Sequence, residues 1–182
     1  ALAATPFLTP AIAQDAPDWH PKWTEDDQLI LPVGYRQWVY LGSPFTPNAL
    51  NGGEAGFPEF HNVYVQPEAL EIYFETGVFP EGTIMLKELQ LTMEGDEEDG
   101  SRQEVSGRGY FPGAFNGVDA SVKDSNRFGE SQNWGYFNFG HHAPPYAASA
   151  AAAPVEACAA CHIDNADEDM VFTRFYAILN TK

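Results

Sequence analysis

The only two cysteines of this 182-residue chain stand three positions apart, at Cys158 and Cys161. Such a pair excludes a fold held together by disulfides, which needs several separated pairs, and it excludes a zinc site with four cysteine ligands. The fold must therefore be held by a hydrophobic core. The length is that of about one domain, and 44% of the residues are hydrophobic, which is too many for a disordered chain.

The two cysteines belong to the pentapeptide Cys158-Ala159-Ala160-Cys161-His162, the pattern of c-type haem attachment. Two thiols one helical turn apart can reach the two vinyl groups on one edge of the porphyrin, and the next residue then lies under the iron as its axial ligand. The alternative is a redox-active Cys-x-x-Cys pair that happens to precede a histidine. Such pairs open a helix after a strand in a βαβ unit, which this sequence does not show. One motif predicts one covalently bound haem, held by Cys158 and Cys161, with His162 on the iron.

The motif lies late in the chain, since only residues 163–182 follow it. Small electron-carrying cytochromes usually place the motif early and take a later methionine or histidine as the sixth iron ligand. Met170 is the only methionine after the motif and fits a core position better than a ligand position, whereas Met85 and Met93 could belong to the core or face the haem. We therefore expect an open or water-bound sixth position, which suits binding or catalysis better than electron transfer alone.

The net charge of the chain disfavours two classes of binding partner. Nine basic and 26 acidic residues give a net charge of −17, which disfavours nucleic acid and anionic membranes and is compatible with a basic protein partner. No segment approaches the ~20 apolar residues of a membrane-spanning helix. Residues 1–13 are either the end of a secretory signal or an N-terminal arm, and residues 14–182 are expected to form a single haem domain. Because c-type haem is attached outside the cytoplasm, we expect a periplasmic protein.

Short segments rich in β-branched and aromatic residues predict strands along most of the chain. They are 61–65, 83–93, 105–111, 118–122 and 134–139. A helix is predicted over 68–76, with Pro67 in its first turn and Gly77 at its end, and further helices over 34–41 and 166–180. Residues 94–104 are expected to form an acidic loop at a hairpin tip, and residues 146–154 a short helix or a spacer. This order of elements predicts an α+β domain with an antiparallel sheet and flanking helices, and with the haem attached near the C-terminus.

One lysine lies on the apolar face of the strand expected over 83–93. Alternation places Lys87 with four apolar residues, and it makes the later half of the opposite face more polar. The four are Met85, Leu89, Leu91 and Met93. Burying an ammonium group is costly, so such a lysine reaches solvent, pairs with an acid or gives up its proton. The patterning alone favours the first two outcomes over a neutral amine, which would be a nucleophile beside the haem.

Residues 34–179 resemble the cytochrome P-460 family in six separated stretches that occur in order. These are GYRQWVYLGSPFTPN (34–48), FHNVYVQPEAL (60–70), FPEGTIMLKEL (79–89), VDASVKDSNRF (118–128), CAACH (158–162) and DMVFTRFYAIL (169–179). In that family a lysine of the third stretch is bonded to a meso carbon of the haem, and Lys87 occupies its position. The resemblance implies this cross-link. It also implies oxidation of hydroxylamine to nitric oxide or nitrous oxide, transfer of electrons to a cytochrome or another acceptor, and a homodimer.

The resemblance also implies a proton acceptor at Asp119, because the family has an acidic residue in the stretch 118–128. Strand alternation points Asp119 away from the face of Val118 and Ala120. In a partly dry pocket it would take up protons during catalysis, and otherwise it would be an ordinary surface carboxylate.

The histidines other than His162 are harder to place. His61, where some relatives carry arginine, could donate to a bound ligand or pass protons, or it could be a histidine satisfied at a strand edge. His141 and His142 precede Pro144-Pro145, and we expect them in a loop rather than as ligands. His20 carries no functional signal.

Two other functions stay open at this point. A relative of cytochrome c-prime-beta would share the architecture, lack the lysine bond and bind nitric oxide in an apolar pocket. An electron carrier would need a sixth protein ligand on the iron. The presence of Lys87 favours the enzyme over the nitric-oxide-binding protein.

Overall fold

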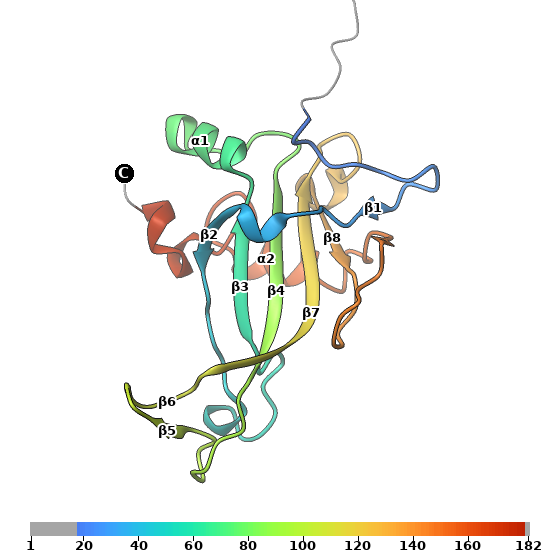
Figure 1. The fold of residues 1–182 in the computed structure, drawn as a ribbon. Coiled ribbons are helices and arrows are strands. Elements are labelled where there is room, and N and C mark those ends of the chain that lie inside the picture. Colours follow the sequence, from blue (N-terminus) through green and yellow to red (C-terminus); the bar gives the residue numbers. More distant parts are fainter. Residues whose placement is uncertain (1–17, 181–182) are drawn as a thin grey trace, which may run out of the picture.

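A five-stranded antiparallel sheet forms the centre of the computed structural model, which describes residues 18–180 (Figure 1). The strands follow the order β2-β3-β4-β7-β8, so each pairs with its neighbour in the chain apart from a small hairpin inserted between β4 and β7. Their bounds are β2 Val39–Gly42, β3 Phe60–Val65, β4 Ile84–Thr92, β7 Pro112–Lys123 and β8 Trp134–Asn138. The predicted α+β class with an antiparallel sheet is confirmed. The segment 1–13 lies outside the described residues.

The remaining elements are short. The inserted hairpin consists of β5 and β6, and β1 pairs with β9 in a second two-stranded sheet. Two α-helices, α1 and α2, and five 3₁₀ turns complete the described chain. Their bounds are β1 Leu29–Ile30, α1 Pro67–Thr76, β5 Arg102–Glu104, β6 Gly107–Gly109, β9 Ser149–Ala150, α2 Ala159–Asn165, and 3₁₀ turns at Tyr35–Gln37, Asn48–Leu50, Gly129–Ser131, Thr173–Phe175 and Ala177–Asn180. Within residues 18–180 no helix is long and apolar enough to cross a membrane.

Both faces of the sheet are covered, by different parts of the chain. The N-terminal segment with β1 crosses one face, and α2 with the C-terminal segment lies behind the other (Figure 1). On the first face, Leu86, Val118 and Val122 pack in one cluster with Leu29. On the second face, Val65 and Met85 pack in another cluster that includes residues of α2 and of the C-terminal segment. The strands can therefore carry apolar residues on both faces.

The segments with the clearest local signals fold as predicted. The strands predicted over 61–65, 83–93, 118–122 and 134–139 correspond to β3, β4, β7 and β8. Helix α1 begins at Pro67, and Gly77 ends it in the left-handed conformation with φ 84°, where its N–H donates to the Tyr73 carbonyl. Residues 146–154 form a spacer that contains β9 rather than a helix.

Three predicted elements were wrong. Residues 34–41 form a 3₁₀ turn and then β2, because Val39 and Tyr40 pair with β3 instead of continuing a helix. The strand expected over 105–111 is broken, since fully exposed Val105 lies in the turn of the β5–β6 hairpin. The helix expected over 166–180 is absent: Asp169 and Met170 adopt positive φ values of 49° and 62°, and two 3₁₀ turns follow.

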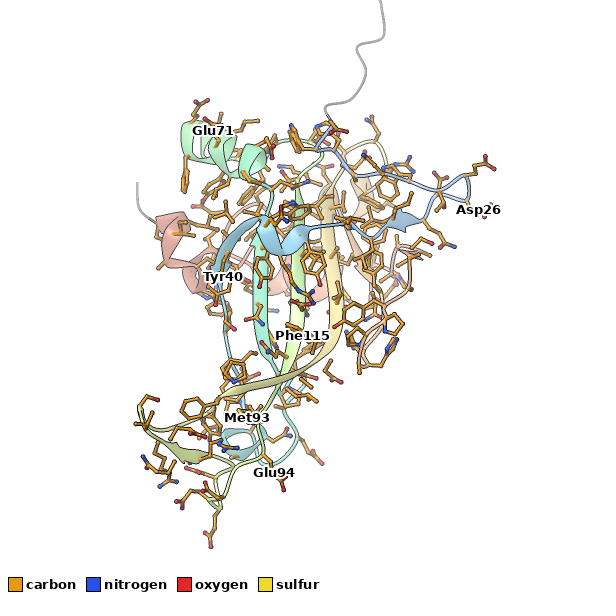
Figure 2. All side chains as sticks on the ribbon, in the orientation of Figure 1. Asp26, Tyr40, Glu71, Met93, Glu94 and Phe115 are labelled. Atoms are coloured by element: carbon orange, nitrogen blue, oxygen red, sulfur yellow. The ribbon has the colours of Figure 1, made fainter. Side chains whose placement is uncertain are left out.

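The β5–β6 hairpin projects from the end of the central sheet. Pairing between β4 and β7 shifts register near Gln90, and beyond this point the chain turns away into β5 and β6 (Figure 1). Met93 and Glu94 begin this projection (Figure 2). The predicted acidic loop over 94–104 is therefore partly strand, because β5 occupies its last three residues.

Candidate functional site

Three polar residues lie in one row across the sheet. Lys87 of β4 stands opposite Asp119 of β7, and Asp119 stands opposite Asn138 of β8. The next row on the same face contains Met85, opposite Ser121. Because side chains alternate along a strand, the register itself brings these groups together on one face. The predicted face of Lys87 and the predicted orientation of Asp119 both agree with this arrangement.

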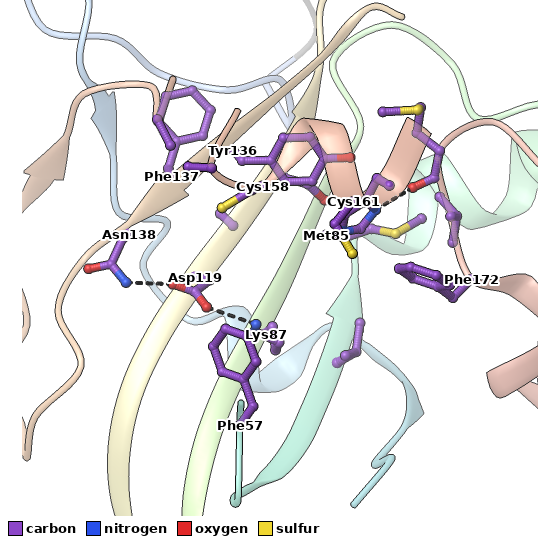
Figure 3. A pocket seen from close by; sticks show the side chains of 18 of the residues that line it. Phe57, Met85, Lys87, Asp119, Tyr136, Phe137, Asn138, Cys158, Cys161 and Phe172 are labelled. Carbon is purple, nitrogen blue, oxygen red and sulfur yellow. Dashed lines mark hydrogen bonds and ion pairs between the residues drawn. The ribbon is translucent and has the colours of Figure 1, made fainter. Parts of the chain in front are cut away.

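A cavity of about 270 Å³ lies beside these rows, close to the lower end of the range for sites of small organic ligands. It is bounded by β4, β7 and β8 on one side and by α2 and the segment after it on the other (Figure 3). Its lining is mainly apolar and contains aromatic residues from several elements, among them Phe57, Tyr136 and Phe172. Met85 and Met170 also line it and are buried, whereas Met93 is exposed at the far end of β4.

Lys87 and Asp119 form an ion pair at the cavity. The Lys87 Nζ lies 2.9 Å from the Asp119 Oδ2, and the two side chains are 28% and 21% exposed (Figure 3). The Phe57 ring covers the ammonium group, with Nζ 4.2 Å from its centroid, which adds a cation–π contact. Of the three outcomes that the sequence left open for this lysine, the structure shows pairing with an acid.

The other oxygen of Asp119 is also engaged. Its Oδ1 accepts a hydrogen bond of 2.8 Å from the Asn138 side-chain amide and lies 3.0 Å from the His141 Nε2. Gly117 allows the loop of His141 to approach, because a Cβ there would meet the Gly140 carbonyl oxygen and the His141 ring at 3.0 Å each. The half-exposed His141 therefore links Asp119 to solvent.

The cysteines lie where the cavity meets solvent. Cys158 precedes α2 directly and Cys161 lies in its first turn, so the two thiols project from neighbouring positions of one helical turn. Both line the cavity and are exposed (Figure 3). Partial burial is the main cause that raises the pKa of the Cys158 thiol, and the nearby Asp119 adds to it. Cys158 therefore favours the protonated thiol.

His162 has only one ring nitrogen free for a ligand. Its Nδ1 lies 2.7 Å from the Met170 carbonyl oxygen, and since a carbonyl can only accept, Nδ1 carries the proton and Nε2 the lone pair. Burial lowers the pKa of His162, which favours the neutral imidazole. The ring packs between Tyr136 and Phe172, with centroids 4.6 and 4.9 Å away. A neutral, oriented imidazole of this kind is the usual state of a metal-bound histidine.

Tyr136 adds a further polar atom to this site. Its hydroxyl is buried, and no hydrogen-bond partner for it exists among the described residues. Burial raises the pKa of the phenol, which therefore stays protonated. Buried hydroxyls are nearly always paired, so this one is available to a group bound in the cavity.

A family model for cytochrome P460 matches residues 32–173, which is most of the chain and includes every residue of the site described above. The chain belongs to the cytochrome P460 family. It is therefore a haem protein, as the resemblance of its six stretches predicted. Among curated proteins, none matches the chain.

The residues of the site fit a haem. Within the described chain no three histidine, cysteine or acidic side chains are grouped as metal ligands. A haem iron would bring its porphyrin ligands with it and would need little more than His162 from the protein. The mainly apolar cavity suits the macrocycle, and the two thiols at its rim are positioned to hold it. His162 would bind the iron through Nε2, and the Tyr136 hydroxyl would be free to contact the bound group.

The predicted site residues do not all lie together. Lys87, Asp119, Cys158, Cys161 and His162 line one cavity. His61 does not line this cavity. It lies on the Lys87 face of the sheet, two residues before Val63, which does line the cavity. The His61 Nε2 is 3.3 Å from the Phe57 carbonyl oxygen. Its ring meets the Phe57 ring edge-on.

Four residues of the site carried no functional signal in the sequence. Tyr136 and Asn138 lie on the strand predicted over 134–139, but alternation alone does not mark them as site residues. His141 lies in a loop, as predicted, but this loop brings it to Asp119, and nothing in the local sequence signals that contact. Phe57 lies in an irregular segment before β3 and reaches Lys87 only through the tertiary fold.

Proposed function

We propose that this family member carries one haem bound covalently through Cys158 and Cys161, with His162 on the iron, and that it oxidises hydroxylamine to nitric oxide or nitrous oxide in the periplasm. The observation that carries the proposal is the Lys87–Asp119 pair, which lines the same cavity as the two thiols and His162. A purely electron-carrying haem would have no use for a proton acceptor beside an open cavity. The resemblance adds a homodimer, which sedimentation of the holoprotein would test.

The haem, when bound, supplies the iron that binds the substrate nitrogen and accepts its electrons for transfer to an acceptor such as a cytochrome. Oxidation of hydroxylamine to nitric oxide releases equal numbers of protons and electrons. Asp119 would take up these protons, which is supported by its position as an ionisable carboxylate in the cavity lining. His141, which is half-exposed and 3.0 Å from Asp119, can pass them to solvent.

Lys87 would form the family's cross-link, which its place in the lining of the cavity supports. Its amine must first lose a proton to become a nucleophile, and Asp119 at 2.9 Å is the nearest acceptor. The bond would join Nζ to a meso carbon and would replace one N–H and one C–H bond. Two protons and two electrons would leave, so the step would need an oxidant of the peroxide class, which would be reduced to water. The Phe57 ring, stacked on the amine, restricts the directions in which Nζ can move.

The alternative function is binding of nitric oxide without a cross-link, as in cytochrome c-prime-beta. The observation in its favour is the mainly apolar and aromatic lining of the cavity, which suits an uncharged diatomic ligand. The ion pair also offers Lys87 a stable state in which it remains a free ammonium.

Peptide mass spectrometry of the protease-digested holoprotein separates the two functions. The enzyme predicts a species in which one haem joins the peptide of Cys158 and Cys161 to the peptide of Lys87, together with turnover of hydroxylamine. Haem on the cysteine peptide alone, with Lys87 free and no turnover, would favour the nitric-oxide-binding protein. A ferric spectrum typical of iron with a second protein residue as its sixth ligand would instead indicate an electron carrier. Met85, which is buried and lines the cavity, would be the first candidate for that ligand.

A further inference from the structure

The turn after α2 has an unusual backbone. Glu168 and Val171 close it with a hydrogen bond of 2.9 Å from the Val171 N–H to the Glu168 carbonyl, and its two central residues are Asp169 and Met170. Both have positive φ values, 49° and 62°. Turns of this hand favour asparagine or aspartate followed by glycine, so a methionine in the second position is strained. Strain of this kind persists only where the surrounding structure enforces it.

A network anchored on the sheet enforces it. The Asp169 carboxylate accepts hydrogen bonds from the Lys123 Nζ at 2.7 and 2.8 Å, from the Trp134 Nε1 at 3.1 Å and from the Phe79 N–H at 3.1 Å. Lys123 and Trp134 stand opposite each other on β7 and β8, and Lys123 also donates to the Phe79 carbonyl at 2.8 Å. The Lys123 side chain is only 9% exposed. The Asp169 side chain is 18% exposed, and a partly buried carboxylate with this many donors has little freedom to move.

The strained turn presents one group to the site. The carbonyl of Met170 accepts the hydrogen bond from the His162 Nδ1 at 2.7 Å, while the Met170 side chain is buried in the core and lines the cavity. The residue whose backbone is strained is thus the residue that orients the imidazole. Releasing Asp169 would let the turn relax and would move that carbonyl away from Nδ1.

We propose that Lys123, Asp169 and Trp134 are positioning residues for the axial histidine: they hold the Met170 carbonyl against His162 and so set the orientation and basicity of the imidazole toward the haem iron. The inference rests on the ligand role of His162 proposed above and not on the substrate. A hydrogen bond to the far nitrogen raises the donor strength of a metal-bound imidazole, and a stronger donor stabilises ferric iron over ferrous iron. The network thereby lowers the reduction potential of the haem.

Two variants of the holoprotein test this role. Asp169→Asn removes the charge but keeps a residue that tolerates the left-handed conformation, and Trp134→Phe removes the indole N–H and leaves the ion pair in place. The measurements are the iron–histidine stretching band of the ferrous haem by resonance Raman and the reduction potential. We expect the band to move to lower frequency and the potential to rise, more in Asp169→Asn than in Trp134→Phe.

Matched controls lie on the other face of the sheet. Glu88→Gln alters a buried ion pair with Arg36, and Phe139→Leu removes aromatic volume from the other core cluster. Both should lower stability and leave the band and the potential unchanged. If the network variants lose stability in the same way without moving either signal, the network only ties down the C-terminal segment and the proposal is wrong.

The remaining outcomes are also decisive. If Asp169→Asn does not fold, Trp134→Phe decides, because a shifted band supports the proposal and an unshifted band refutes it. A wild-type holoprotein without an iron–histidine band would refute the ligand role of His162 and this inference with it. Failure of the hydroxylamine proposal is a separate result, since the wild-type protein would then show the band without turnover, and the two variants would still show the shifts.

Discussion

Lys87 and Glu88 are neighbours on β4, and they lie on opposite faces of the sheet in two very different surroundings. The Glu88 side chain is 1% exposed, accepts a hydrogen bond of 2.6 Å from the Tyr35 hydroxyl and pairs with Arg36. Lys87 is 28% exposed and its partner Asp119 21%, beside a cavity. One pair is closed within the protein, and the other remains within reach of a ligand.

The comparison shows that burial alone does not mark a functional charge. Glu88 is the most buried of these charged groups, yet its partners satisfy it, and neither Glu88 nor Arg36 lines the cavity of Lys87. It fastens the Tyr35–Gln37 turn to β4, and so it connects two of the stretches that carry the family resemblance. The Lys87–Asp119 pair lines one cavity together with the Phe57 ring, His141 and the two thiols. Ionisable groups gathered in a cavity in this way are typical of functional sites.

The largest expected effect is that of Lys87→Ala. The variant should keep covalent haem on Cys158 and Cys161 and lose oxidation of hydroxylamine, because the cross-link can no longer form. Steady-state turnover and the haem–peptide masses measure the two results. Lys22→Ala is the matched control, since Lys22 is an exposed lysine whose one acidic partner within residues 18–180 is Asp18 at 3.5 Å. Equal turnover in Lys87→Ala and wild type would remove Lys87 from the mechanism.

Asp119→Asn should slow oxidation of hydroxylamine by about 10²–10⁴-fold, the range for loss of a positioned general base. Binding of nitric oxide to the ferrous haem should be little changed, because the amide keeps a similar shape. Asp124→Asn is a close control: Asp124 is also 21% exposed and pairs with a basic residue, Arg127, away from the cavity. A general base at Asp119 is contradicted by a turnover rate that matches the control.

Glu88→Gln should act on stability instead of activity. We expect the free energy of unfolding to fall by about 1–3 kcal/mol, since the buried hydrogen bonds of a charged group are weakened while the half-exposed Arg36 can turn to water. Urea unfolding of the holoprotein measures the loss, and turnover of hydroxylamine per folded molecule should equal that of wild type. Reduced turnover with unchanged stability would show that the two faces of β4 are not separate in function.

The smallest expected effect is a change in stability with pH that arises from His61, which lies on the Lys87 face of the sheet. Burial lowers its pKa below the ordinary 6.5, and the charge of Lys87 adds to this. Between the lowered value and 6.5 the unfolded chain binds a proton that the folded protein does not, so the free energy of unfolding falls as the pH drops through this window. Above 6.5 His61 is neutral in both states, so it causes no further change in the free energy of unfolding. Urea unfolding on either side of 6.5 should show a smaller decline for His61→Gln than for wild type, and equal declines would contradict the assignment.

The sequence predicted the elements whose signals are local. Pro67 and Gly77 mark the ends of α1, and period-two alternation gives β4 and β7 together with the faces of Lys87 and Asp119. The pentapeptide 158–162 gives the two thiols and His162 in one short helix. In each case the chemistry depends on residues a few positions apart, whose relative placement follows from the geometry of a helix or a strand.

The tertiary structure decided what depends on distant partners. His141 meets Asp119 across 22 positions, Glu88 meets Arg36 across 52, and Asp169 meets Lys123 across 46. The last contact holds Asp169 and Met170 in a left-handed turn where the apolar spacing of residues 166–180 had predicted a helix. Local spacing cannot reveal such contacts, because a partly buried carboxylate with three donors stabilises a strained backbone that its own segment would not adopt. The sequence by itself therefore determined the groups that we propose to bind the haem, whereas the tertiary structure decided which groups surround and orient them.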